Sequence, residues 1–95
     1  MSAPSMEVAR SAACLATRVG EEIVILHPDR GEFVGLNESA AQIWDLLDRA
    51  RSIGAICEEL SERFDTQPDT CRPQVQRFVD QMIDRGVLVA VPPAP

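Results

Sequence analysis

The sequence lacks lysine and tyrosine altogether, and it contains a single histidine, His27, and a single tryptophan, Trp44. Without lysine, the chain has no residue for Schiff-base chemistry or for the phosphate contact of a Walker-type loop. One histidine leaves little room for a metal site or for a catalytic site that depends on histidine. These absences predict a chain without a catalytic centre, a metal or a cofactor.

Cysteine is also scarce, because the chain has only Cys14, Cys57 and Cys71, which are widely spaced and form no Cys-x-x-Cys pair. This pattern predicts neither a disulfide framework nor a zinc site, and it favours a reducing cytoplasm. Cys57 precedes Glu58 and Glu59, and nearby carboxylates raise the pKa of a thiol. A buried apolar role is therefore favoured for Cys57, and a cysteine-dependent enzyme is the weakest functional hypothesis.

Positive charge is in the minority, since nine arginines stand against fifteen acidic residues and the formal net charge is -6. Such a chain is repelled by phosphate backbones and anionic membrane surfaces over about 8 Å at physiological salt. The first eleven residues contain Glu7 and no long apolar run, so neither a signal peptide nor a membrane span is predicted. We expect neither nucleic acid nor a membrane as a partner.

The length of 95 residues, with 45% hydrophobic and 25% charged residues, fits one globular domain. Residues 1–12 predict a flexible lead-in, residues 13–91 the folded domain, and residues 92–95 a frayed tail. Inside the domain, three runs have β-type composition, at residues 14–19, 22–26 and 32–36. Pro28 and Gly31 supply turn chemistry between the last two runs. This order predicts a three-stranded meander.

From Asn37 onward the apolar period changes from two to about 3.6, which predicts helices. Asn37 or Ser39 can cap the first helix, which ends near Arg49. Ser52 can cap a second helix, which ends near Phe64. Trp44 lies on the apolar face of the first helix, and we expect it in the core.

A loop is predicted at residues 65–72, and a third helix then begins with Pro73 in its first turn and ends before Gly86. Its apolar stripe is the most regular in the chain and consists of Val75, Phe78, Val79, Met82 and Ile83. We expect about two of these side chains in a surface groove and the rest in the core. Met82 is the preferred groove residue, because a thioether adapts to varied ligands.

A meander followed by three helices is an α+β fold similar to a winged helix-turn-helix. The strand at residues 32–36 ends the meander, so one row of its N–H and C=O groups is unpaired unless another element covers it. Such an edge can bind an extended peptide, while a neighbouring apolar helix face supplies pockets for its side chains. Gly35 in this strand is compatible with a β-bulge or with close approach of a peptide backbone.

Several blocks of the sequence resemble the PqqD-like family, the precursor-recognition proteins of ribosomal peptide pathways. The blocks are GEFVGLN at residues 31–37, AAQIWDLL at 40–47, ICEEL at 56–60, VQRFV at 75–79 and RGVL at 85–88. Their order and spacing carry the resemblance, which covers residues 14–88. Two positions depart from the family pattern: Pro73 lies where relatives continue the third helix from an earlier start, and Gln74 replaces a frequent Asp.

The resemblance implies a binding protein without catalysis, which holds the leader segment of a precursor peptide as an added strand beside the third helix. By position, the implied peptide-binding residues are Glu32, Phe33, Val34, Gly35, Leu36, Val75, Phe78, Val79 and Met82. The implied partners are the leader peptide, a leader peptidase, and a cyclase or other modifying enzyme.

We favour a similarity to the free-standing recognition proteins of lasso-peptide pathways. One alternative is the member that serves pyrroloquinoline quinone synthesis and presents a peptide to a radical SAM enzyme. A winged-helix DNA-binding protein is an alternative of a different class, against which the net charge of -6 is the main argument. The oligomeric state stays open, because an unoccupied edge strand can pair with a second copy.

Overall fold

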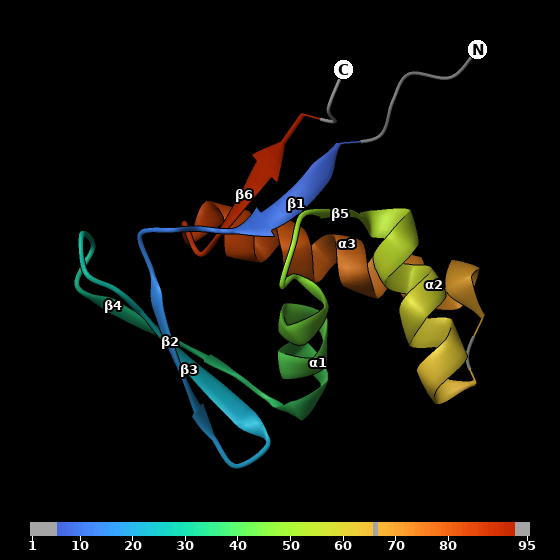
Figure 1. Cartoon of the computed structure of the whole chain (residues 1–95), viewed down its shortest axis with the longest axis horizontal. Coiled ribbons are helices and arrows are strands. Elements are labelled where there is room, and N and C mark those ends of the chain that lie inside the picture. Colours follow the sequence, from blue (N-terminus) through green and yellow to red (C-terminus); the bar gives the residue numbers. More distant parts are fainter. Residues whose placement is uncertain (1–5, 66, 93–95) are drawn as a thin grey trace.

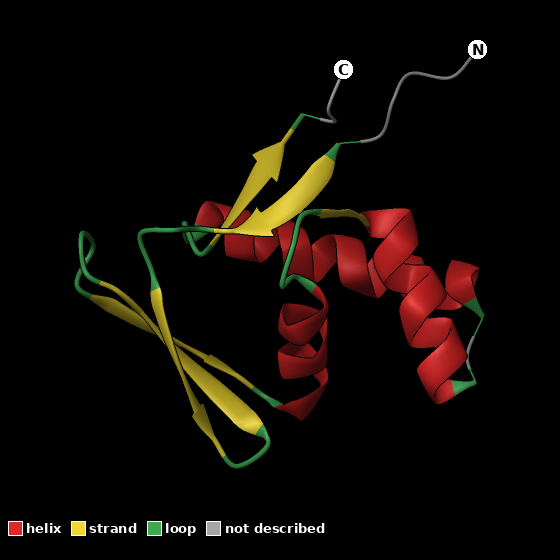
Figure 2. Cartoon of the chain, viewed as in Figure 1, coloured by secondary structure: helices red, strands yellow, loops and turns green. Residues whose placement is uncertain are grey.

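The computed structural model describes residues 6–65 and 67–92, in which six strands and three helices form two sheets flanked by helices (Figure 1). The elements are β1 (Glu7–Arg10), β2 (Leu15–Val19), β3 (Glu22–His27), β4 (Glu32–Leu36), α1 (Glu38–Leu46), β5 (Arg51–Ser52), α2 (Ile53–Phe64), α3 (Pro68–Asp84) and β6 (Leu88–Val91). The antiparallel sheets have the strand orders β2-β3-β4 and β5-β1-β6 (Figure 2). The α+β class is confirmed, and the second sheet adds to what was expected.

Tight turns connect the strands of the β2-β3-β4 sheet. Val19 pairs with Glu22 across a two-residue turn in which Gly20 has a φ of 64°. Glycine at this first central position is typical of a type II′ hairpin turn, whose twist matches that of the strands. The second turn, at residues 28–31, ends on Gly31 with a φ of 66°. The predicted meander is therefore present, and β4 has the expected bounds.

The N-terminal segment differs from the expected lead-in, because Glu7–Arg10 forms β1. This strand pairs with β6 along its whole length and with β5 at its start, and Val8 is buried. Residues 1–5 of the expected lead-in and residues 93–95 of the expected tail lie outside the described residues. A four-residue strand with a single buried side chain carries little local pattern, so its distant partner strand decides its structure.

Side-chain caps begin the first two helices. The Asn37 side chain accepts a hydrogen bond from the backbone N–H of Ala40 at 2.9 Å, so Asn37 rather than Ser39 caps α1. Ser52 accepts one from Ala55 at 3.1 Å, and α2 has the expected start and end. Only the end of α1 differs, since the helix stops at Leu46 and not near Arg49. These short-range bonds explain why the sequence located both starts.

The third helix begins earlier than expected, at Pro68 instead of Pro73. Pro68 occupies the first turn, where a missing N–H costs nothing, and the predicted loop shrinks to the residues around Asp65, which has a φ of 51°. Pro73 lies inside the helix, where it removes one hydrogen bond close to the N-terminus. The extra turn places Cys71 in the core, and this burial offsets the lost bond.

Gly86 ends α3 in a Schellman arrangement, with Gly86 N–H bonded to the Ile83 carbonyl and Val87 N–H to the Met82 carbonyl. Its φ is 81°, and a Cβ at this position would lie 2.9 Å from Nε2 of the buried His27. Both features require glycine, as the sequence predicted for this helix end.

We expect Gly86→Ala to lower the free energy of unfolding by about 2 kcal/mol, because the left-handed backbone and the contact with His27 both oppose a methyl group. Gly20→Ala is the matched control, since Gly20 is also left-handed but has nothing within 4 Å of its Cβ position. Urea unfolding followed by circular dichroism measures both variants. Equal losses in the two would show that the His27 contact contributes nothing.

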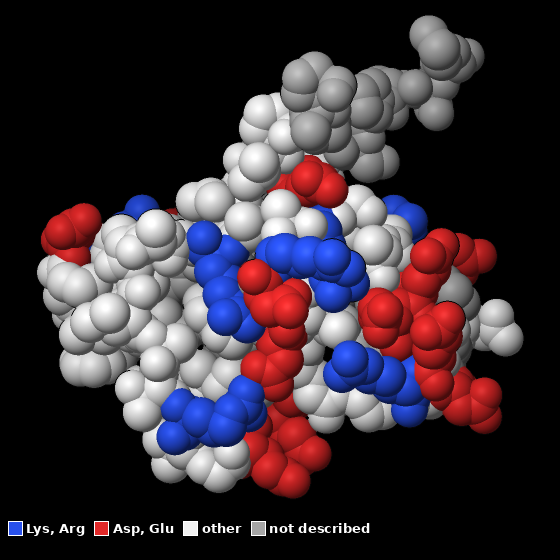
Figure 3. Space-filling model, viewed as in Figure 1, with Lys and Arg blue, Asp and Glu red and all other residues white. Residues whose placement is uncertain are grey.

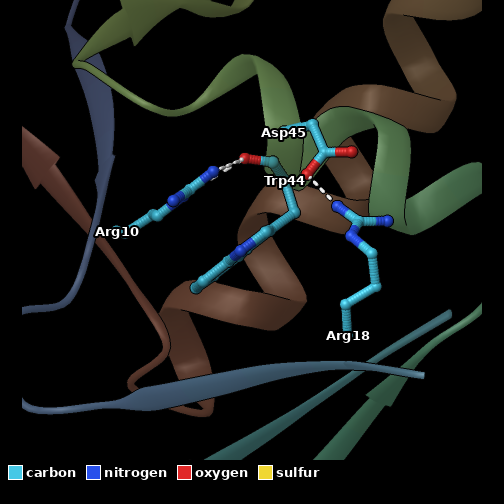
Figure 4. A network of polar contacts seen from close by, with 4 residues as sticks. All are labelled: Arg10, Arg18, Trp44 and Asp45. Carbon is cyan, nitrogen blue, oxygen red and sulfur yellow. Dashed lines mark hydrogen bonds and ion pairs between the residues drawn. The ribbon is translucent and has the colours of Figure 1, made fainter.

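The core lies between the helices and the inner sheet faces, and its least exposed side chains include Ile25, Ile56 and Val87, all 0% exposed. Trp44 on α1 joins this core, as expected, and is 5% exposed. Its backbone carbonyl accepts two hydrogen bonds from Arg10 on β1, while Asp45 pairs with Arg18 on β2 (Figure 4). Helix α1 is thereby tied to a strand of each sheet.

Candidate functional site

Strand β4 lies at an edge of its sheet, with β3 as its neighbour on one side and, within the described residues, no strand on the other. It continues directly into Asn37 and α1. Gly35 pairs in register with Val24, so β4 has no bulge at this position. The glycine is an ordinary strand residue with open space around its Cβ position. An extended chain can therefore approach β4 along its full length.

The hairpin register decides which β4 backbone groups are available. Val19 and Glu22 flank the two-residue turn and form a hydrogen-bonded pair, so the backbone groups of Glu22 point toward β2. This orientation alternates along the strand. Ile25, three residues later, therefore directs its N–H and C=O toward β4. Its partner on β4 is Val34, whose backbone groups therefore point into the sheet. The N–H and C=O groups of Phe33 and Gly35 point to the free edge, where an added strand would find them.

Side chains alternate along β4 as they do in any strand. Val34 and Leu36 turn inward and are 4% and 3% exposed, whereas Phe33 turns outward and is 68% exposed. Of the expected peptide-binding residues on this strand, Phe33 and Gly35 thus offer backbone groups and Val34 offers a wall. Glu32 is exposed at the start of the strand.

A groove of about 560 Å³ runs between β4 and the C-terminal half of α3. Its lining residues are Val34, Gly35, Gln81, Met82, Asp84 and Arg85. The structure thus brings the predicted residues Val34, Gly35 and Met82 together. Gln81, Asp84 and Arg85 were not among the predicted binding residues. They recur at i, i+3 and i+4 and so form one face of the helix beside Met82. The groove is therefore of mixed character, with Val34 and Met82 as its apolar side chains and these three residues as its polar ones.

A second hollow, of about 430 Å³, lies beyond the end of β4, where α1, α2 and α3 meet. It includes the predicted residues Phe78 and Val75, together with Ile43 from α1 and Leu60 and Phe64 from α2. These α1 and α2 residues lie on the apolar faces of their helices and were not among the predicted binding residues. Phe64 is nevertheless 51% exposed, so the hollow has an apolar rim as well as an apolar floor.

The groove and the hollow open along one side of α3. Arg85, Met82, Phe78 and Gln74 follow one another at intervals of three or four residues, which is the spacing of a single helix face. Together the two concavities extend from the β4 edge to the start of α1.

Val79 lies elsewhere, although it belongs to the same predicted stripe. It is 1% exposed and faces a different hollow, toward β1 and β5, which Ile83 also lines. Helix α3 borders a hollow toward each sheet, so one apolar stripe divides between two sides. The sequence predicted that the stripe divides between groove and core and placed Met82 in the groove, but it did not show that Val79 and Ile83 face the other sheet.

The Cys57 thiol is poorly suited to act as a nucleophile. Burial raises the pKa of the Cys57 thiol to about 11, and a side-chain hydrogen bond with Cys71 contributes, so Cys57 is protonated at neutral pH. Across residues 6–65 and 67–92, no group of three or more His, Cys, Asp or Glu side chains could hold a metal ion. In the same part of the chain, no helix is long and apolar enough to cross a membrane.

Charged side chains of both signs alternate over the helical part of the molecule (Figure 3). The face that Figure 3 shows has no continuous basic surface of the kind that follows a phosphate backbone. On this face, the region over the β2-β3-β4 sheet, at the left of the view, is mostly uncharged. These surfaces suit contacts with proteins or peptides better than contacts with nucleic acid.

Comparison with known proteins adds to this geometry. Among solved structures, TbiB1 in complex with the TbiA(beta) leader peptide is similar to this chain, with a TM-score of 0.78 and 21% sequence identity. The match covers 84% of this chain and 93% of TbiB1, which establishes a shared fold. No curated protein sequence matches the chain significantly.

The sequence also matches the family model described as Coenzyme PQQ synthesis protein D (PqqD) over residues 22–88. This match spans more than half of the chain and includes β3, β4 and all three helices. Both walls of the groove, and the hollow beyond it, lie inside the matched region. On this evidence, the chain belongs to the PqqD family.

Proposed function

We propose that this chain binds the leader segment of a ribosomally made precursor peptide as an added strand on β4 and delivers it to the enzymes that mature it. The observation that carries the proposal is the unpaired edge of β4 beside a groove whose opposite wall is α3. Main-chain hydrogen bonds to Phe33 and Gly35 would supply affinity, and the groove would select side chains. Membership of the PqqD family and the fold shared with leader-bound TbiB1 support the proposal.

The dimensions of the site suit a short extended segment. From Arg85 to Gln74, α3 rises by about 16 Å, which an extended chain covers with about five residues. Strand β4 itself has five residues. A peptide of this length on the β4 edge would place one apolar side chain against Met82 and another, nearer α1, in the hollow beside Phe78.

We further propose that the pathway makes a lasso peptide, in which a leader peptidase and a cyclase act on the delivered precursor. The alternative is a pathway in which a radical SAM enzyme modifies the bound peptide. The two are distinguished by the genes beside this one: a leader peptidase and an asparagine-synthetase-like cyclase support the lasso pathway, and a radical SAM enzyme supports the alternative.

The direct test is fluorescence anisotropy with a labelled leader peptide from the neighbouring precursor gene. We expect saturable binding that a scrambled leader of the same composition does not show. Because strand addition uses the peptide backbone, N-methylation of leader amides that face β4 should weaken binding, while N-methylation of the alternate amides should not. If the leader does not bind, or if N-methylation has no position dependence, strand addition is wrong.

Phe78→Asp is expected to weaken leader binding by about tenfold or more, because a carboxylate in the apolar hollow opposes burial of a peptide side chain. Ile83→Asp is the matched control: Ile83 lies five residues further along α3, is 36% exposed, and lines the hollow on the other side of the helix. Anisotropy titrations compare the two variants after circular dichroism has shown that both are folded. Equal affinities for Phe78→Asp and the unmodified chain would remove the hollow from the site.

A further inference from the structure

The outer face of the β2-β3-β4 sheet, which is turned away from the helices, is apolar where a solvated sheet face is usually polar. The register aligns Leu15 with Leu26 and Leu26 with Phe33, so one apolar row crosses all three strands. The two ends of this row are open to solvent, because Leu15 is 64% and Phe33 is 68% exposed.

A second row continues the apolar surface toward the β2-β3 turn. Thr17, Val24 and Gly35 are aligned across the strands, and Val24 is 37% exposed. Val19, at the end of β2, is 59% exposed on the same face. Together these side chains form a patch on the order of 400 Å², which is the size of the largest patch on many monomers and is often functional. All five residues of β2 are exposed, and so are Val24 on β3 and Phe33 on β4. No other element within the described residues therefore covers these parts of the patch.

We propose that this outer sheet face is the docking surface for the enzyme that acts on the bound peptide, which rests on the function proposed above. The patch is continuous with the binding edge, because Phe33 and Gly35 of β4 belong to its two rows. A strand added to β4 extends the sheet, and its alternate side chains point outward beside Phe33 and Gly35. The inward side chains are enclosed by α3, so the outward ones are the part of the bound segment that an enzyme can still contact.

The docking surface is therefore composite, with the peptide as a fourth strand beside β4. An enzyme that contacts both the patch and the peptide binds the loaded chain more tightly than the free chain. By linkage, the enzyme then strengthens peptide binding by the same factor. This coupling would direct the enzyme to chains that carry a precursor.

Charge and area identify a different protein, rather than a second copy, as the occupant. Two such patches in contact would bury about 800 Å² in total, less than the roughly 1,200 Å² of a stable interface, whereas an enzyme that also contacts the bound peptide buries more. The patch also has an acidic end at Glu21 and Glu22, and repulsion from Glu21 raises the pKa of the neighbouring Glu38 carboxyl. A complementary partner presents an apolar patch with basic groups at the corresponding rim.

The test uses Leu15→Glu and Val24→Glu, which place a charge in the patch on β2 and β3, outside the strand that binds the peptide. Val89→Glu on β6 is the matched control, since Val89 is 41% exposed on the other sheet. The probes are the labelled leader peptide and the leader peptidase or radical SAM enzyme encoded beside this chain. We expect both patch variants to slow processing of the precursor about tenfold or more, with leader affinity within about twofold of the unmodified chain. Val89→Glu should change neither quantity.

Three outcomes would overturn the proposal. Unchanged processing by the patch variants would show that the enzyme docks elsewhere. Loss of leader affinity in these variants would show that the patch serves the peptide instead. A dimer of the unmodified chain in sedimentation experiments, converted to a monomer by Leu15→Glu, would assign the patch to a second copy. Failure of the unmodified chain to bind the leader is a separate result, which contradicts the proposed function itself.

Discussion

Gly35→Pro is expected to reduce leader affinity about a hundredfold while the chain stays folded. Proline removes the N–H that points to the free edge, leaves a peptide carbonyl unpaired, and puts its ring in the path of the added strand, which together cost about 3 kcal/mol. The fold tolerates proline here because an edge-strand N–H that faces solvent has no partner to lose. Anisotropy titration with the labelled leader measures the effect.

Ala16→Pro is the matched control for this variant. Ala16 lies on β2, the opposite edge of the same sheet, and is aligned with Ile25. Since Ile25 directs its backbone groups toward β4, those of Ala16 point away from the sheet, so this proline also replaces a free N–H. Leader affinity should be unchanged by Ala16→Pro. If the two prolines have the same effect, the β4 edge does not bind the peptide.

Trp44→Ala is expected to lower the free energy of unfolding by about 4 kcal/mol, a large fraction of the 5–15 kcal/mol typical of a domain. The indole is 5% exposed, and the Arg10 guanidinium lies 4.8 Å from its ring centroid. Truncation leaves a cavity between α1 and both sheets and removes the cation–π contact. Circular dichroism is the appropriate probe, because the chain has no other tryptophan.

Arg10→Met tests the polar part of this contact. Methionine keeps an apolar stem over the indole but removes the charge and both hydrogen bonds to the Trp44 carbonyl, so we expect a loss of about 2 kcal/mol. Melting temperatures should follow the same order, with Trp44→Ala below Arg10→Met. A Trp44→Ala loss no larger than the Arg10→Met loss would show that the cavity is filled by repacking.

Short-range signals in the sequence were reliable guides to the helices. The Ser52 cap located the start of α2, and the glycine at position 86 located the end of α3, because each depends on hydrogen bonds within a few residues. The start of α3 was wrong, since two prolines, Pro68 and Pro73, both fit a first helical turn. Only packing of the extra turn, with Cys71 in the core, selects Pro68.

The candidate site was predicted less completely than the elements that form it. The edge strand and Met82 could be identified from strand order and residue type. The sequence did not show that Val79 faces the second sheet, because β1 was not expected and α3 was given one sheet to cover. The outer apolar rows that include Phe33 depend on register, which the alternation within a single strand does not specify.

By itself, the sequence determined an acidic α+β domain with an edge strand followed by three helices, because composition, turn residues and helix caps act locally. Tertiary structure decided which backbone groups of β4 are free, which side of α3 faces them, and where apolar side chains remain exposed. Each of these depends on pairing or packing between segments far apart in the chain, such as β1 with β6. The free energy of such contacts belongs to pairs of segments, and no single segment encodes it.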